Sequence, residues 1–199
     1  MNRTKEVGKT SFLKRLLFSR VLEDKNQAHK IAYIAVTTAL CIIVNTLEIK
    51  LTVAQFSFTI FFSAFAGVVL GGGAGFCACF LGDMLGFFIH PMGEYSPWIG
   101  ISTGLMAFFA AAVLYCSKQP RKNIYLKLTL ACVLIFVVCT SGITALYLNK
   151  VWYSSMGFFE YLSMRLFVQG QIWNSVFNSV LIVLGIPALV KIKAFKINL

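Results

Sequence analysis

The chain has 199 residues, of which 58% are hydrophobic and only 13% are charged, and its formal net charge is +11. Soluble globular domains carry about 25% charged residues, so this composition excludes an ordinary soluble fold and indicates an integral membrane protein. The six cysteines lie in apolar runs and lack the spacing of a metal site, and we expect neither a metal nor a bound cofactor.

Apolar runs along the chain predict the membrane helices, each of which needs about 20 apolar residues. The run from Phe56 to Ile89 is too long for one crossing. Gly71-Gly72-Gly73 near its middle permits a tight reversal, so we divide this run into two short helices. The predicted fold is an all-α integral membrane bundle of six helices, at Ile31–Leu47, Phe56–Leu70, Ala74–Ile89, Trp98–Cys116, Leu126–Leu148 and Leu166–Leu189.

Basic residues cluster in three segments that an even number of crossings places on one side of the membrane. These are the N-terminal segment 1–30, the loop after the fourth helix and the tail 191–199. The positive-inside rule makes that side cytoplasmic, with residues 31–190 forming the membrane domain. Within the first segment we expect Ser11–Leu22 to form an interfacial amphipathic helix or part of a disordered basic tail.

The first predicted helix carries a stripe of small side chains. The stripe consists of Ala28, Ala32, Ala35 and Ala39, whose spacing of four, three and four residues places them on one helical face. Small side chains let another helix approach closely, which favours helix association in lipid. The spacing is equally typical of a face that docks a partner protein and of one that packs inside its own bundle.

The third predicted helix contains a carboxylate, Asp83, and ends in a compact loop. A charged group in hydrocarbon costs about 2.5–3.5 kcal/mol on insertion scales, so Asp83 indicates a packing or functional role. His90 follows seven residues later, and because it precedes Pro91 we expect it to close the helix rather than to relay protons.

The outward side and the last helix collect polar and aromatic residues. In the last helix Gln171, Asn174 and Asn178 share one face, and Arg165, Gln169 and Trp173 share an adjacent one. Amides pair with flat heterocycles, Trp offers a stacking face, and Arg binds carboxylates, whereas interhelical hydrogen bonding is the alternative explanation. The predicted ligand-binding residues are Tyr95, Trp98, Lys150, Arg165, Gln169, Gln171, Trp173, Asn174 and Asn178.

Six short spans, the Ala35-Val-Thr-Thr-Ala39 pattern and the run from Gly82-Asp83 to Tyr95-Ser96-Pro97 resemble the substrate-binding S components of energy-coupling-factor (ECF) vitamin transporters. The resemblance covers about Ile31 to Leu189 and is closest to the folate group. Asp83 and Gly86 match an Ala-Asp-Leu-xx-Gly segment of that group, and Arg165 matches the cationic residue that opens its last span. Its Pro-x-Gly-x-Tyr-x-Pro loop is matched by Pro91, Gly93, Tyr95 and Pro97.

The resemblance implies a binding subunit rather than an enzyme. Such a subunit captures a vitamin from outside, here folate or a related pterin, in the bacterial plasma membrane. It docks through the alanine stripe on a partner ECF transmembrane subunit, and two separate ATPase subunits drive release inside. The alternatives are a stand-alone proton- or ion-coupled carrier that uses Asp83, and a small intramembrane enzyme with Asp83 as its acid or base.

Overall fold

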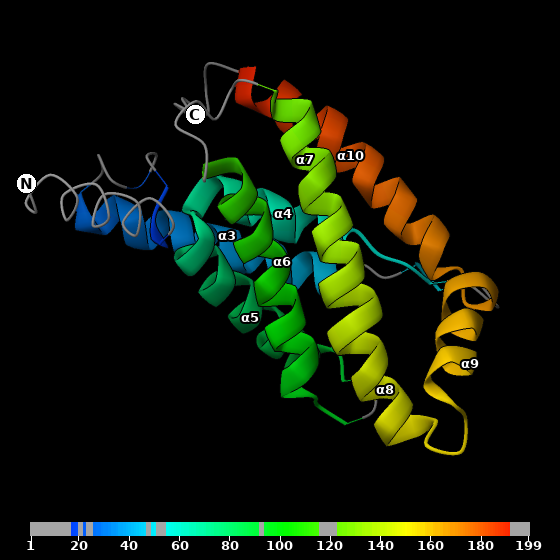
Figure 1. Cartoon of the computed structure of the whole chain (residues 1–199). Coiled ribbons are helices and arrows are strands. Elements are labelled where there is room, and N and C mark those ends of the chain that lie inside the picture. The colour runs from blue at the N-terminus through cyan, green and yellow to red at the C-terminus, as the bar shows by residue number, and fades with distance from the viewer. Residues whose placement is uncertain are drawn as a thin grey trace, which may run out of the picture.

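The computed structural model describes residues 17–19, 22, 26–46, 49–50, 55–91, 94–115 and 123–191, and within them the fold is almost entirely helical (Figure 1). This confirms the predicted all-α class. The elements in chain order are α3 (Gln27–Thr46), β1 (Ile49–Lys50), β2 (Gln55–Phe56), α4 (Thr59–Leu70), α5 (Gly72–Ile89), α6 (Pro97–Tyr115), α7 (Ile124–Leu134), the π-helix η1 (Ile135–Thr144), α8 (Ala145–Trp152), α9 (Phe158–Ser163), the π-helix η2 (Met164–Val168) and α10 (Gln171–Lys191).

Five helical segments of the described chain are long and apolar enough to cross a membrane. They are α3, α5, α6, the continuous stretch Ile124–Trp152 and the part of α10 up to Leu189. The remaining predicted crossing, the second in chain order (Phe56–Leu70), corresponds to α4, an apolar helix of 12 residues. At 1.5 Å per residue α4 is about 18 Å long, less than the hydrocarbon core of about 30 Å, so the count of six crossings stays a prediction.

The predicted reversal at the glycine triplet is confirmed. Helix α4 ends at Leu70 and α5 begins at Gly72, with Gly71 between them at a φ of 94° that only glycine adopts readily. A Cβ on Gly71 would also lie 2.5 Å from the backbone nitrogen of Ser19. The turn therefore depends on glycine both for its backbone angle and for the space that the neighbouring chain fills.

Part of the N-terminal segment packs onto this turn. Ser19 and Leu22 are fully buried, and the Ser19 N–H donates to the Leu70 carbonyl at 3.0 Å, which satisfies a free C-terminal carbonyl of α4. These two residues are thus packed against the folded bundle, and the predicted boundary at residue 30 stays a prediction. The interfacial helix predicted over Ser11–Leu22 lies mostly outside the described residues.

Helix α6 occupies the centre of the bundle, where it packs against α4, α5, α7 and η1. Its contact with α4 is very close, because a Cβ on Gly67 would lie 2.0 Å from the Ala107 carbonyl oxygen. Small residues such as Ala64, Ala110 and Ala111 are buried in the same core. Close packing of small residues is the usual way in which helices associate in lipid.

The last two predicted helices differ most from the structure. The fifth extends from Ile124 to Trp152 and passes through η1, so it is longer than the predicted Leu126–Leu148. The sixth begins at Gln171 rather than Leu166, because the chain bends at Gly170, whose φ is 70°. The prediction that Arg165, Gln169 and Trp173 share a face of one helix is therefore wrong.

The remaining helix boundaries differ from prediction by a few residues. Helix α3 begins at Gln27 instead of Ile31. Helix α4 begins at Thr59 instead of Phe56, because Phe56 pairs with Ile49 in a short antiparallel hairpin between α3 and α4.

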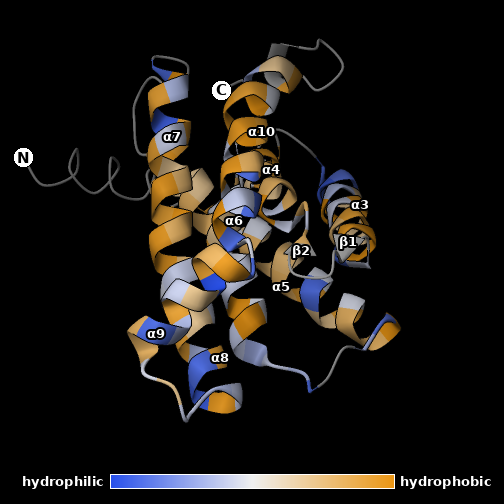
Figure 2. Cartoon of the chain, turned by 90° about the vertical axis from the view of Figure 1, so that its right-hand side faces the viewer, coloured by the Kyte–Doolittle hydropathy of each residue, from blue (hydrophilic) through white to orange (hydrophobic). Residues whose placement is uncertain are grey.

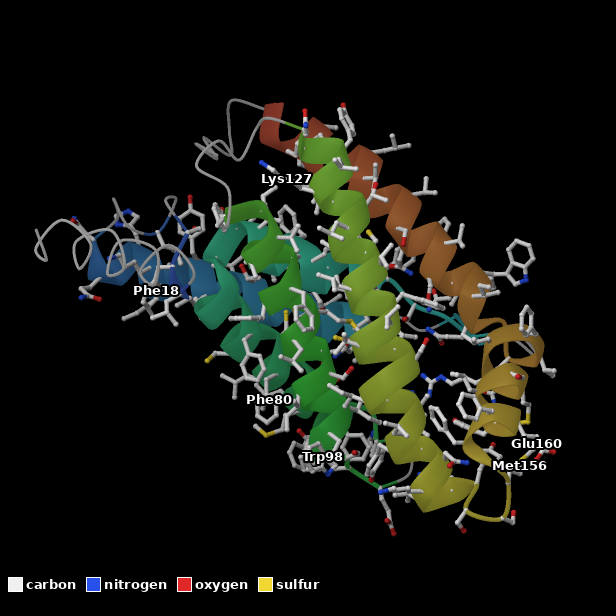
Figure 3. The ribbon with its side chains drawn as sticks, viewed as in Figure 1. Phe18, Phe80, Trp98, Lys127, Met156 and Glu160 are labelled. Carbon is white, nitrogen blue, oxygen red and sulfur yellow. The ribbon has the colours of Figure 1, made fainter. Side chains whose placement is uncertain are left out.

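The two ends of the bundle differ in composition. Lys127, near the start of α7, lies at the same end as the end of α10, whereas Trp98, Met156 and Glu160 lie at the opposite end (Figure 3). Hydrophobic residues dominate α7 and α10, and hydrophilic residues gather around α8 and α9 (Figure 2). The three basic segments lie almost entirely outside the described residues, so a basic side and its assignment to the cytoplasm stay predictions.

Candidate ligand-binding site

A cavity of about 450 Å³ opens where the α3–α4 hairpin, the α5–α6 loop and the η2–α10 bend come together. Cavities of about 300–1,000 Å³ are typical of small-molecule sites. Side chains from α3, α4, α5, α6, η1, η2 and α10 line it, and many of them are polar. A polar cavity within an apolar bundle indicates a binding function, since the bundle itself gains nothing from it.

One wall ties three helices together by hydrogen bonds. The Thr59 hydroxyl of α4 donates to Asn45 Oδ1 of α3 at 3.0 Å, and Asn45 Nδ2 donates to Asp83 Oδ1 of α5 at 3.3 Å. All three residues line the cavity. Asp83 thus faces a polar space rather than lipid, which explains how a carboxylate is accommodated in an apolar helix.

The α5–α6 loop supplies an aromatic wall around Tyr95. The Tyr95 ring lies 5.9 Å from Phe88 in a stacked arrangement and 5.3 Å from Phe87, which also lines the cavity. Burial, and secondarily the Asp83 charge, raise the pKa of the Tyr95 hydroxyl above its ordinary value. Tyr95 therefore stays neutral at physiological pH, and its hydroxyl is buried without a hydrogen-bond partner among the described residues.

Hydroxyl side chains from α6 and η1 form a third wall. The Thr144 hydroxyl donates to Ser102 Oγ at 2.9 Å, and Ser102 in turn donates to the Cys139 carbonyl at 3.2 Å. Thr140 is only 3% exposed, and its hydroxyl has no partner in the described part of the chain. π-Helical turns recur at functional sites, and η1 brings both Thr140 and Thr144 to the cavity.

The charged wall comes from η2. Arg165 lines the cavity, and its Nε and Nη1 are buried with no hydrogen-bond partner among the residues that the structure describes. Asp83 and Glu94 lie in the same lining, so the site carries charges of both signs. The bend at Gly170 separates Arg165 from α10, yet Gln171 and Asn174 at the start of α10 still join it at the cavity.

The asparagines of α10 hydrogen-bond the backbone around Ser57 and the start of α4. Asn178 is fully buried; its Oδ1 accepts from the Phe61 N–H at 3.0 Å, and its Nδ2 donates to the Ser57 carbonyl at 2.8 Å. Asn174 Oδ1 accepts from the Ser57 N–H at 3.2 Å. The interhelical alternative therefore describes Asn178, which lies outside the cavity, whereas Asn174 both bonds the hairpin and lines the cavity.

The predicted site residues divide into two groups. The cavity brings together Tyr95, Arg165, Gln171 and Asn174, along with Asp83 and Gly86 of the third helix. The other five lie outside the cavity wall: Trp98, Trp173 and Lys150 are exposed, Gln169 is half-buried and Asn178 is buried. Of the loop motif, Pro91 and Pro97 are exposed, and Gly93 lies outside the described residues.

Sequence reasoning missed a set of small polar residues that line the cavity from inside apolar helices. They are Asn45, Thr59, Ser102, Thr103, Thr140 and Thr144. A signal for some of them exists in the sequence, because Thr140 and Thr144 are four residues apart and so fall close together on one helical face.

The alanine stripe lies on the outside of the bundle. Ala28, Ala32, Ala35 and Ala39 are all exposed, whereas the buried residues of α3 are Thr37, Cys41 and Val44. Helix α3 packs on α5 through this other face, where a Cβ on Gly82 would lie 2.5 Å from Cys41 Cβ. The alternative that the stripe packs inside its own bundle is wrong.

The fold and the cavity define a class: a small multi-pass helical membrane protein with a polar, ligand-sized site at one end. Over residues 25–194 the chain matches the family described as ECF-type riboflavin transporter, S component, and it belongs to that family. The chain is thus a substrate-binding membrane subunit of an ECF importer, which confirms the resemblance to S components. The closer resemblance to the folate group is not confirmed, since the matching family is described by riboflavin. No curated protein matches the chain.

Proposed function

We propose that the protein captures a flat, acceptor-bearing vitamin from outside the cell in the 450 Å³ cavity and passes it to an ECF transmembrane subunit. The observation that carries this proposal is a single cavity that combines the buried Arg165 guanidinium, the Tyr95 aromatic cluster and the Gln171 and Asn174 amides. Aromatic faces stack on flat rings, and amides pair with their edges.

Two ligands are the leading candidates. Folate or a related pterin is the ligand predicted from the sequence, and riboflavin is the one that the family description names. Both have a flat heterocycle, but folate also carries an anionic glutamate. A buried, unpartnered guanidinium favours an anionic ligand, because charge-assisted hydrogen bonds are about twice as strong as neutral ones. Arg165 thus supports folate or another anionic vitamin.

The exposed alanine face of α3 is the proposed docking surface for the partner transmembrane subunit. Four small side chains on one lipid-facing surface allow a partner helix to approach closely. Energy then comes from two ATPase subunits of the same complex. We further propose six crossings with α4 as a short one, both termini in the cytoplasm, and the plasma membrane as the site of action. The support is the clustering of basic residues in three sequence segments that an even number of crossings would put on one side of the membrane.

The test is a binding titration of the purified protein alone in detergent, without ATP, using folate and riboflavin and the intrinsic tryptophan fluorescence. Saturable binding of one of them, together with uptake into vesicles only when the ECF module is present, is the expected result. Uptake by the protein alone that follows a proton gradient, without ATPase subunits, would instead identify a stand-alone carrier centred on Asp83.

A further inference from the structure

Unpartnered hydrogen-bonding groups concentrate in one place in this protein. In the described part of the chain, six residues have buried side-chain nitrogen or oxygen atoms without a hydrogen-bond partner, and four of them line the cavity. The four are Tyr95, Ser96, Thr140 and Arg165, and they come from the α5–α6 loop, η1 and η2. The other two, Ser141 and Ser175, lie outside the cavity wall.

Native proteins leave few buried polar groups unpaired, because each one has given up its water without a replacement. A cluster of them around one cavity is explained if a ligand completes the hydrogen bonds. The neighbouring hydroxyls support this explanation, since Ser102 and Thr144 are already engaged in hydrogen bonds within the wall while Thr140 is not. The hydrogen bonds within this wall do not use the Thr140 hydroxyl, which is therefore available to a ligand.

The four groups also share a chemical bias. Each can donate a hydrogen bond; the three hydroxyls can also accept one, whereas the Arg165 guanidinium can only donate and so sets the bias. Such a wall pairs with acceptor atoms, such as ring carbonyl oxygens, unprotonated ring nitrogens or a carboxylate. A ligand edge made only of donors would leave the guanidinium nitrogens unpaired and would bind poorly.

We infer that Tyr95, Thr140 and Arg165 recognise acceptor atoms of the cargo, and that Thr140 is a specificity-determining residue presented by the π-helix η1. The inference rests on the proposed function, because it assigns the polar contacts of the same cavity. It predicts a cargo whose ring edge is rich in carbonyl oxygen or ring nitrogen and whose most electron-rich group lies against Arg165.

The experiment compares Thr140→Val and Tyr95→Phe with the wild-type protein, since both changes remove a hydroxyl with little change in shape. Riboflavin and folate are the probes. A neutral hydrogen bond contributes about 0.5–1.5 kcal/mol, so we expect each variant to bind the probe about 2- to 12-fold more weakly. The melting temperature of the empty protein should stay the same or rise, because the lost hydroxyl had no partner.

Ser141→Ala and Ser175→Ala are the matched controls, since each removes a buried, unpartnered hydroxyl from outside the cavity. They should leave affinity unchanged. If the wild type binds a probe and both Thr140→Val and Tyr95→Phe bind it with undiminished affinity, the inference is overturned and the proposed function stays intact. A lower melting temperature of the empty variants would overturn it too, by assigning the hydroxyls a structural role. If the wild type binds neither probe, the proposed function fails, and this inference fails with it.

Discussion

Replacing Arg165 with Gln tests the charge that the site presents to its ligand. The change keeps a hydrogen-bonding side chain at the cavity and removes the positive charge. Arg165 Nε and Nη1 are buried and unpartnered among the described residues, so no described ion pair is broken by the change. We expect the variant to fold, and to lose affinity for anionic ligands selectively.

The size of the effect follows from the bond that is lost. A hydrogen bond to a charged group contributes about 1.5–3 kcal/mol, which corresponds to roughly 10- to 150-fold in affinity for a ligand carboxylate. For a neutral ligand the lost bond is worth about 0.5–1.5 kcal/mol, or roughly 2- to 12-fold. The carboxylates of Asp83 and Glu94 line the same cavity and repel an anion. We therefore expect the loss of affinity for a ligand carboxylate to lie near the lower end, about 10-fold.

The assay is a fluorescence titration of wild type and Arg165→Gln with folate and with a neutral pterin that lacks the glutamate. Arg165→Lys is the matched control, because it keeps the charge and should retain the preference for the anionic ligand. Lys150→Gln removes an exposed cation outside the cavity and should change neither affinity. Equal losses for the charged and the neutral ligand in Arg165→Gln would refute the reasoning and make Arg165 a structural residue.

Three further predictions concern docking and stability. Ala35→Phe enlarges the exposed face of α3 and should leave ligand affinity unchanged while abolishing uptake in cells that contain the ECF module; lost affinity in the purified variant would contradict this. Gly67→Ala places a Cβ 2.0 Å from the Ala107 carbonyl oxygen and should cost about 3 kcal/mol of stability, seen as a lower melting temperature in detergent. The control is Gly157→Ala, where a Cβ meets nothing within 4 Å; because Gly157 is the N-cap of α9, a loss much smaller than that of Gly67→Ala is expected. Asn178→Ala removes the hydrogen-bond partner of the Phe61 N–H and of the Ser57 carbonyl, and should lower the free energy of unfolding by about 2–4 kcal/mol. Trp173→Ala, an exposed position on the same helix, should lower it far less. Equal losses of stability in the two variants would mean that the Asn178 amide does not hold the hairpin.

The class of the protein and the positions of most helices follow from the amino-acid sequence alone. Apolar runs mark membrane helices because lipid offers no partner to the backbone, and the glycine triplet marks a reversal because only glycine adopts such a φ readily. The exposed stripe from Ala28 to Ala39 was also predictable as a single face, since helical periodicity alone fixes it. These features are local, and local chemistry decides them.

The binding site, in contrast, depends on how the helices pack. Asn45, Thr59 and Asp83 meet only because three helices pack together, and no periodicity relates residues so far apart in the chain. Packing also decided that Asn178 bonds the backbone of the hairpin while Thr140 faces the cavity unpaired. A polar residue in an apolar helix needs a partner whatever its role, and only the position of the neighbouring helices shows whether that partner is the protein or its ligand.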